Sequence, residues 1–353
     1  MTAAMAMLAA SYIGLTHLVF LSFGSWLNHV YPVCNLLLCY MGISAHRFLN
    51  EEREKRRIRQ TFGLYVHRSV VEEILEHPER IRLGGEKKEL SVLFSDVRGF
   101  TSLSEKMRPE ELVPQLNEYL TRMTTVVFEQ HGTLDKYIGD GIMAIFGAPL
   151  VQEDHPYRAC STAIDMIENL RDLQNSWQKQ GKPILQIGIG INSGWMLVGN
   201  IGSDRRLDYT GLGDNVNLAS RLEGLTKRYG VPIIVSETTW ESVKHHFAGR
   251  LLDVVGVKGK EKLVSIFQIL GRISDSSVFD EPLERYRKGM ENYRNRNWSE
   301  AEILFKNVES WWPGDPPSCL YQQRCRELLA NPPAKDWDFV TIDRRQTKGT
   351  RTG

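Results

Sequence analysis

This sequence lacks three features that would each place it in a special class of protein. Its 353 residues include only five cysteines, at positions 34, 39, 160, 319 and 325, and no two of them form a C-x-x-C pair. A disulfide scaffold and a cysteine-rich zinc site are therefore not expected. Lys and Arg number 44 against 43 Asp and Glu, so no charge excess indicates a partner such as a nucleic-acid polymer. The hydrophobic fraction of 42% excludes wholesale disorder.

Asp, Glu, Lys and Arg are absent from the first 46 residues. Because a membrane helix needs roughly 20 mostly apolar residues, residues 1–48 are expected to form two transmembrane helices, at about 3–23 and 31–48. The basic run from Arg53 to Arg59 favours the cytoplasmic side for everything that follows. A cleaved signal peptide and a buried soluble hairpin are the alternatives, and the signal peptide lacks the usual basic segment before its apolar run.

The rest of the chain divides into four segments by its residue pattern. Residues 49–83 have apolar residues at near-helical spacing and predict a helical juxtamembrane connector. Residues 84–271 alternate strands with helices and predict an α+β fold, an antiparallel-rich sheet with helices on one face. Residues 278–330 predict a small helical segment similar to a tetratricopeptide helix pair. Residues 331–353 are expected to be a partly disordered tail.

Two aspartates stand at the ends of predicted strands. Asp96 comes directly after an apolar strand, and Asp140 lies at the tip of a predicted hairpin. If the strands are neighbours in one sheet, the two carboxylates can lie side by side. Two close carboxylates repel each other unless a cation lies between them, so the pair predicts a Mg²⁺ or Mn²⁺ site. Taken singly, Asp96 can be explained as a helix cap instead of a metal ligand, and Asp140 as an ordinary turn residue.

Three further segments carry groups that suit a nucleotide. The loop Gly99-Phe100-Thr101 leads into a helix, whose N-terminus attracts phosphate oxygens. Asn217 and Arg221 lie one turn apart on another helix, and an amide and a guanidinium there suit a ribose and a phosphoryl group. On spacing alone, a capping Asn and a surface Arg explain that pair as well. Lys258 lies in a predicted hairpin turn, where a lysine is usually just solvated.

Four motifs occur in order along these segments, at residues 94–101 (FSDVRGFT), 135–141 (DKYIGDG), 208–221 (DYTGLGDNVNLASR) and 257–260 (VKGK). Together they resemble the catalytic domain of class III nucleotidyl cyclases. The chain as a whole resembles bacterial adenylate cyclases of the CHASE2 type without most of their sensor domain. The resemblance implies a ferredoxin-like α+β fold over residues 84–271, and a membrane-bound enzyme in the bacterial inner membrane with its catalytic domain in the cytoplasm.

The resemblance also implies roles for the matching residues. Asp96 and Asp140, with the Val97 carbonyl, would hold two Mg²⁺ or Mn²⁺ ions per active site. Asn217 would position the ribose, and Arg221 would stabilise charge on the α-phosphoryl group. The terminal phosphates would be held by Lys258 and Arg205. The ribose 3′-oxygen of ATP would attack the α-phosphate in line, releasing pyrophosphate and 3′,5′-cyclic AMP.

Base choice and assembly follow from the same resemblance. Lys136 matches the family's adenine-reading lysine, and Thr210 matches a position that holds Asp or Thr in adenylate cyclases and usually Cys in guanylate cyclases. A lysine can donate to N1 of adenine, whereas N1 of guanine carries a hydrogen, so ATP is favoured over GTP. Each site in this family lies between two catalytic domains, which implies a homodimer. The alternatives are a guanylate cyclase and a catalytically silent cyclase-like dimerisation module.

Overall fold

A computed structural model describes residues 2–24, 30–32, 34–35, 37–46, 49, 84–203, 206–256, 263–273, 279–334, 337 and 341–342. The chain divides into two units, residues 1–76 and residues 77–353, and each is described by itself. The predicted connector from residue 50 onward lies outside the described residues, as do Arg205, Lys258 and the tail from residue 343.

The N-terminal unit contains helix α1 (Thr2–Phe23), which ends at Gly24 in the left-handed conformation. None of the helices in the described ranges combines the length and the apolar character that crossing a membrane requires. The structure therefore does not support the two predicted transmembrane helices. Part of the second predicted span lies outside the described residues.

The second unit is built on one sheet with the strand order β2-β3-β1-β4-β6-β8-β7-β9, with β5 paired to β4. Among the strands that the structure describes, only the β4–β6 and β7–β9 pairs are parallel, so the prediction of an antiparallel-rich sheet is confirmed. The strands are β1 (Gly84–Val97), β2 (Thr133–Ile138), β3 (Gly141–Phe146), β4 (Ile187–Ser203), β5 (Arg206–Leu212), β6 (Ile233–Ser236), β7 (Phe247–Gly256), β8 (Leu263–Arg272) and β9 (Thr341–Ile342).

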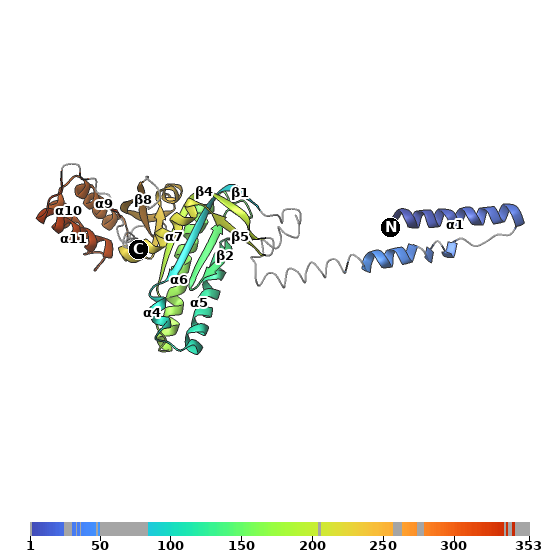
Figure 1. Cartoon of the computed structure of the whole chain (residues 1–353), viewed down its shortest axis with the longest axis horizontal. Coiled ribbons are helices and arrows are strands. Elements are labelled where there is room, and N and C mark those ends of the chain that lie inside the picture. The colour runs from blue at the N-terminus through green and yellow to red at the C-terminus, as the bar shows by residue number, and fades with distance from the viewer. Residues whose placement is uncertain are drawn as a thin grey trace, which may run out of the picture. The chain divides into compact units, whose positions relative to one another are not determined.

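Helices cover both faces of this sheet. Because successive strand residues point to opposite faces, Leu93 of β1 packs with α5 and α6 whereas Val92 packs with α7. In Figure 1, α5 and α6 lie side by side. The helices of this part of the chain are α4 (Phe100–Ser104), α5 (Pro109–Glu129), α6 (His155–Lys179), α7 (Asp214–Tyr229) and α8 (Glu237–Val243).

The prediction of helices on one face is therefore wrong, and two glycines of β4 explain why. In the alternating stretch Ile187–Ile191, the isoleucines are buried under α5 and α6, and the glycines between them suggest a solvent face. Instead α7 lies directly on that face. A Cβ atom at Gly190 would collide with the backbone of Glu223, and one at Gly188 would collide with Thr226. The missing side chains thus allow the close approach of α7 to the strand.

Three C-terminal helices, α9 (Asp280–Arg294), α10 (Trp298–Val308) and α11 (Pro316–Ala330), form a cluster of their own beside β8 (Figure 1). Their core is aromatic, with Tyr286, Phe305 and Tyr321 among its fully buried side chains. An ion pair anchors the cluster to the sheet, because the guanidinium of Arg250 on β7 donates to both carboxylate oxygens of Asp315, at 2.8 and 2.5 Å. Both side chains are less than one-tenth exposed.

Candidate active site

The strand register brings Asp96 and Asp140 together. β1 and β3 run antiparallel, with Ser95 opposite Ile142, so the end of β1 lies beside the tip of the β2–β3 hairpin. The backbone N–H of Val97 donates to Oδ2 of Asp140 at 3.1 Å. A Cβ atom on Gly141 would lie 3.3 Å from Oδ1 of Asp96 and 2.8 Å from the Ser95 carbonyl oxygen. The glycine therefore keeps the hairpin tip close to the Asp96 carboxylate.

These carboxylates form a centre of negative charge. Burial, together with the charge of the neighbouring Asp140 carboxylate, raises the pKa of Asp96 to about 6, against a smaller lowering effect of the Val97 backbone N–H. Burial likewise raises the pKa of Glu223 to about 7, with a contribution from the charge of Asp96 and an opposing one from Arg98. A bound cation would relieve this repulsion.

The two carboxylates suit an ion such as Mg²⁺, which takes only part of its ligands from the protein. Within the described part of the chain, no group of three or more His, Cys, Asp or Glu side chains is arranged to hold a metal. Mg²⁺ is commonly bound by one or two carboxylates, with water and substrate phosphates as its other ligands. Asp96 and Asp140 match that donor set.

Helix α7 presents different residues to its two sides. The carboxylate of Glu223 on α7 lies near Asp96, and this side chain is half-buried against β4. Asn217 and Arg221 are exposed. Residues two apart on an α-helix point about 200° apart, so Arg221 projects away from the side on which Glu223 meets the aspartates. The two predicted groups of catalytic residues thus face different directions within one chain.

Lys136 and Thr210 meet at one buried carboxylate. Thr210 Oγ1 donates to Asp135 Oδ2 at 2.5 Å, and Lys136 Nζ lies 3.3 Å from Asp135 Oδ1. The Asp135 side chain is fully buried, and burial raises its pKa, while Thr210 and Lys136 lower it. The Lys136 side chain is 40% exposed. Its ammonium group is therefore held in place and remains accessible to a ligand.

The predicted phosphate loop precedes a very short helix. Gly99 adopts the left-handed conformation with φ of +69°, and α4 begins at Phe100. The Gly99 carbonyl accepts the Leu103 N–H at 3.1 Å, and the Thr101 carbonyl accepts the Ser104 hydroxyl at 2.8 Å. The loop follows the end of β1 and begins three residues beyond Asp96.

Sequence reasoning missed three residues of this region, namely Asp135, Glu223 and Arg98. Asp135 had a usable signal in the sequence, since it is the residue before Lys136. In the structure, a register shift between Leu134 and Lys136 changes the pairing of β2 at that position. Glu223 and Arg98 had none, because their positions depend on how α7 packs. The Arg98 guanidinium donates to the carbonyls of Val231 at 2.5 Å and Thr226 at 3.3 Å, near the end of α7.

Comparison with known proteins identifies relatives of this chain. The family model for the adenylate and guanylate cyclase catalytic domain matches residues 85–271. An adenylate cyclase of Anabaena cylindrica is 39% identical over 196 residues, which is 54% of this chain and 39% of that protein. The first curated relatives are matched over only 11% to 39% of their own length.

Two solved structures have a similar fold over the same region. The adenylyl cyclase CyaB from P. aeruginosa is 39% identical with a TM-score of 0.50, and the match covers 53% of this chain and 96% of that one. The guanylyl cyclase Cya2 is 38% identical with a TM-score of 0.50, over 54% of this chain and 95% of that one. The solved relatives therefore include enzymes named for either nucleotide.

Proposed function

Because the chain belongs to the adenylate and guanylate cyclase catalytic domain family, we propose that it is an adenylate cyclase, which converts ATP to 3′,5′-cyclic AMP and pyrophosphate. The observation that carries the choice of ATP is the attachment of Lys136 and Thr210 to one buried carboxylate. Asp135 holds the lysine where it donates to N1 of adenine. Guanine carries a hydrogen at N1, and this donor would be left facing the ammonium group.

The aspartate pair gives the site its metal dependence. Asp96 and Asp140, with the Val97 carbonyl, would hold two Mg²⁺ or Mn²⁺ ions, which when bound lower the pKa of the ribose 3′-hydroxyl and neutralise charge on the triphosphate. Asn217 orients the ribose so that its 3′-oxygen lies in line with the α-phosphorus and the leaving pyrophosphate. Arg221 stabilises the charge that develops on the α-phosphoryl oxygens. The loop 99–101, Lys258 and Arg205 contact the remaining phosphates.

A homodimer with two active sites completes this proposal. Arg221 projects away from the side on which Glu223 meets Asp96, so it serves the aspartates of a second chain. Exposed apolar side chains on three strands support such an interface, because large apolar surfaces commonly mark protein contacts. They are Tyr137, Ile138, Leu197, Leu207 and Leu212, on β2, β4 and β5, and Leu197 and Leu212 are paired in register.

A guanylate cyclase is the second candidate, favoured by the similarity to the guanylyl cyclase Cya2. The deciding experiment assays the purified full chain with Mn²⁺ and either ATP or GTP for cyclic product. We expect cyclic AMP in excess, and we expect Lys136→Glu to shift the ATP-to-GTP ratio of kcat/KM by on the order of a hundredfold towards GTP, because a carboxylate accepts the guanine N1–H.

Lys106→Glu makes the matched control, since it places the same charge change on an exposed residue outside the site. A wild-type preference for GTP would reject the ATP assignment. A folded dimer that forms no cyclic product from either nucleotide would instead favour the catalytically silent module.

Membrane attachment is a separate proposal, and it rests on the sequence alone. We infer that the uncharged residues 1–46, followed by a basic run, attach the enzyme to the inner membrane with its catalytic unit in the cytoplasm. In bacterial cells, the full chain should sediment with the membranes and resist alkaline extraction, whereas a chain without residues 1–48 should not. Recovery of the full chain in the soluble fraction would reject this proposal.

A further inference from the structure

The last residue of α7 is joined to helix α11 through a buried carboxylate. The Tyr229 hydroxyl donates to Oδ2 of Asp253 on β7 at 2.8 Å. Nη1 of Arg324, on α11, donates to the same oxygen at 2.8 Å. The Asp253 side chain is only 1% exposed, and its other oxygen accepts the backbone N–H of Val254 at 2.8 Å. The position of Asp253 is therefore fixed from several directions.

Direct packing reinforces this connection. Gly230 ends α7 in the left-handed conformation, with φ of +67°, and a Cβ atom there would lie 2.6 Å from Cβ of Pro316, the first residue of α11. Leu320 of α11 packs into the same apolar cluster as Leu218 and Leu222 of α7. Helix α7 and the N-terminal half of α11 thus pack against each other.

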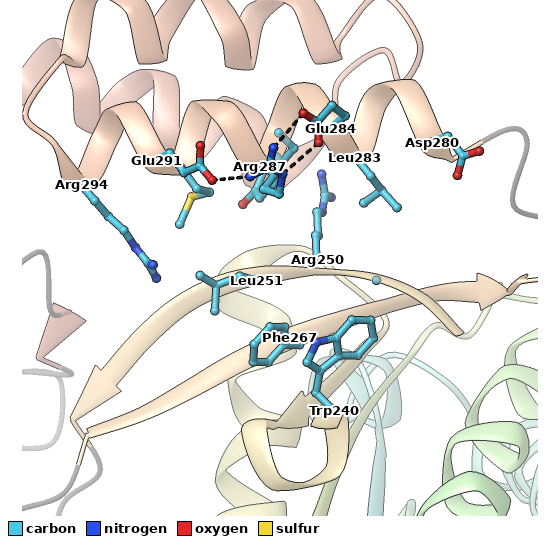
Figure 2. A pocket seen from close by; sticks show the side chains of 13 residues that line it. Trp240, Arg250, Leu251, Phe267, Asp280, Leu283, Glu284, Arg287, Glu291 and Arg294 are labelled. Carbon is cyan, nitrogen blue, oxygen red and sulfur yellow. Dashed lines mark hydrogen bonds and ion pairs between the residues drawn. The ribbon is translucent and has the colours of Figure 1, made fainter. Parts of the chain in front are cut away.

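The C-terminal helices differ in how they meet the sheet. Figure 2 shows α9 above strands β7 and β8, with a cavity of about 430 Å³ between them. Ion pairs on α9 join Arg287 to Glu284 and Glu291, within the helix itself. Helix α11 is instead fastened to β7 at two points, by Arg250 to its N-cap Asp315 and by Arg324 to Asp253. Two ion pairs therefore connect α11 to β7.

We propose that Tyr229, Asp253 and Arg324 are positioning residues, which set the orientation of α7 and thereby of Asn217 and Arg221. This inference rests on the proposed function of those two side chains. Twelve residues separate Tyr229 from Asn217, which is about 18 Å along a helix. A tilt of about 5° at the Tyr229 end therefore moves Asn217 by about 1.5 Å, and a misplacement of about 1 Å can cost about a hundredfold in rate.

The test compares full-length variants that differ only at these contacts. Arg324→Gln should lower kcat for cyclic AMP formation about tenfold and leave KM for ATP within about twofold, because the lost interactions act in the transition state. Arg324→Lys should recover much of that loss, and Tyr229→Phe should lower kcat about threefold. Arg326→Gln is the matched control, since Arg326 lies on the same helix but pairs with Glu302 of α10.

Hydrogen exchange gives a second readout that needs no activity. Backbone amides of residues 214–222 should exchange faster in Tyr229→Phe and Arg324→Gln than in wild type or in Arg326→Gln. Unchanged exchange there would overturn the proposal, and so would an unchanged kcat in a variant whose melting temperature has fallen. If Arg324→Gln does not fold, Tyr229→Phe decides. If the wild-type chain makes no cyclic product, the proposed function fails, and the exchange data still decide whether α11 holds α7.

Discussion

The Asp140→Ala chain is expected to form cyclic AMP at least about a thousandfold more slowly than the wild-type chain. Asp140 supplies half of the carboxylate pair at the end of β1, and a metal ion contributes several kcal/mol of transition-state stabilisation. Since each 1.4 kcal/mol is a factor of ten in rate, losing the ion reaches this magnitude. The measurement is the initial rate with saturating ATP and Mn²⁺.

The melting temperature of the Asp140→Ala chain distinguishes a loss of activity from a loss of the fold. Removing Asp140 relieves the repulsion that helps to raise the pKa of Asp96, and the hydrogen bond from the Val97 N–H is lost in exchange. These two effects oppose each other, so the melting temperature should change by only a few degrees. Asp172→Ala, which removes an exposed carboxylate on α6, is the control. An Asp140→Ala rate within tenfold of wild type would exclude the proposed metal site.

Mixing two inactive chains is expected to restore activity from nearly nothing to about a quarter of the wild-type rate. An Asp96→Ala chain still carries Asn217 and Arg221, and an Asn217→Ala chain still carries both aspartates. A heterodimer of the two therefore has one complete site and one doubly defective site. Random pairing makes about half of the dimers heterodimers, which leaves about a quarter of all sites intact.

The control for the mixing experiment is each variant alone at the same total concentration. Two different affinity tags allow the heterodimer to be purified, and its rate should then approach about half that of wild type. A tagged heterodimer that is confirmed by mass and remains inactive would show that each chain builds its sites alone.

Local patterns placed Asp96 and Asp140 at the ends of strands, and their role as metal ligands stays a prediction. Asp96 follows an apolar strand and Asp140 lies at a hairpin tip, and both features can be read from a few neighbouring residues. The structure adds the fact that these strands are adjacent, which makes the two carboxylates neighbours. The order of the strands could be expected only through the resemblance to a known family.

Contacts between distant segments escaped the sequence interpretation. The stretch from Ile187 to Ile191 alternates in the same way whether its glycine side faces water or a helix, so the pattern could not reveal that α7 covers it. The carboxylate of Asp135 is buried beside Thr210, which lies 75 residues further on and donates a hydrogen bond to it. Neither fact has a periodic signature, since each depends on the tertiary packing of separate elements.

The opposite directions of Glu223 and Arg221 on α7 have a genetic consequence. If each site takes aspartates from one chain and Arg221 from the other, an inactive chain paired with a normal one still leaves one complete site. In a cell that expresses wild-type and Asp140→Ala copies equally, half of all sites would remain intact. Loss-of-function alleles of this gene would then be recessive or additive in their effect on cyclic AMP, and would not suppress the product of a normal allele.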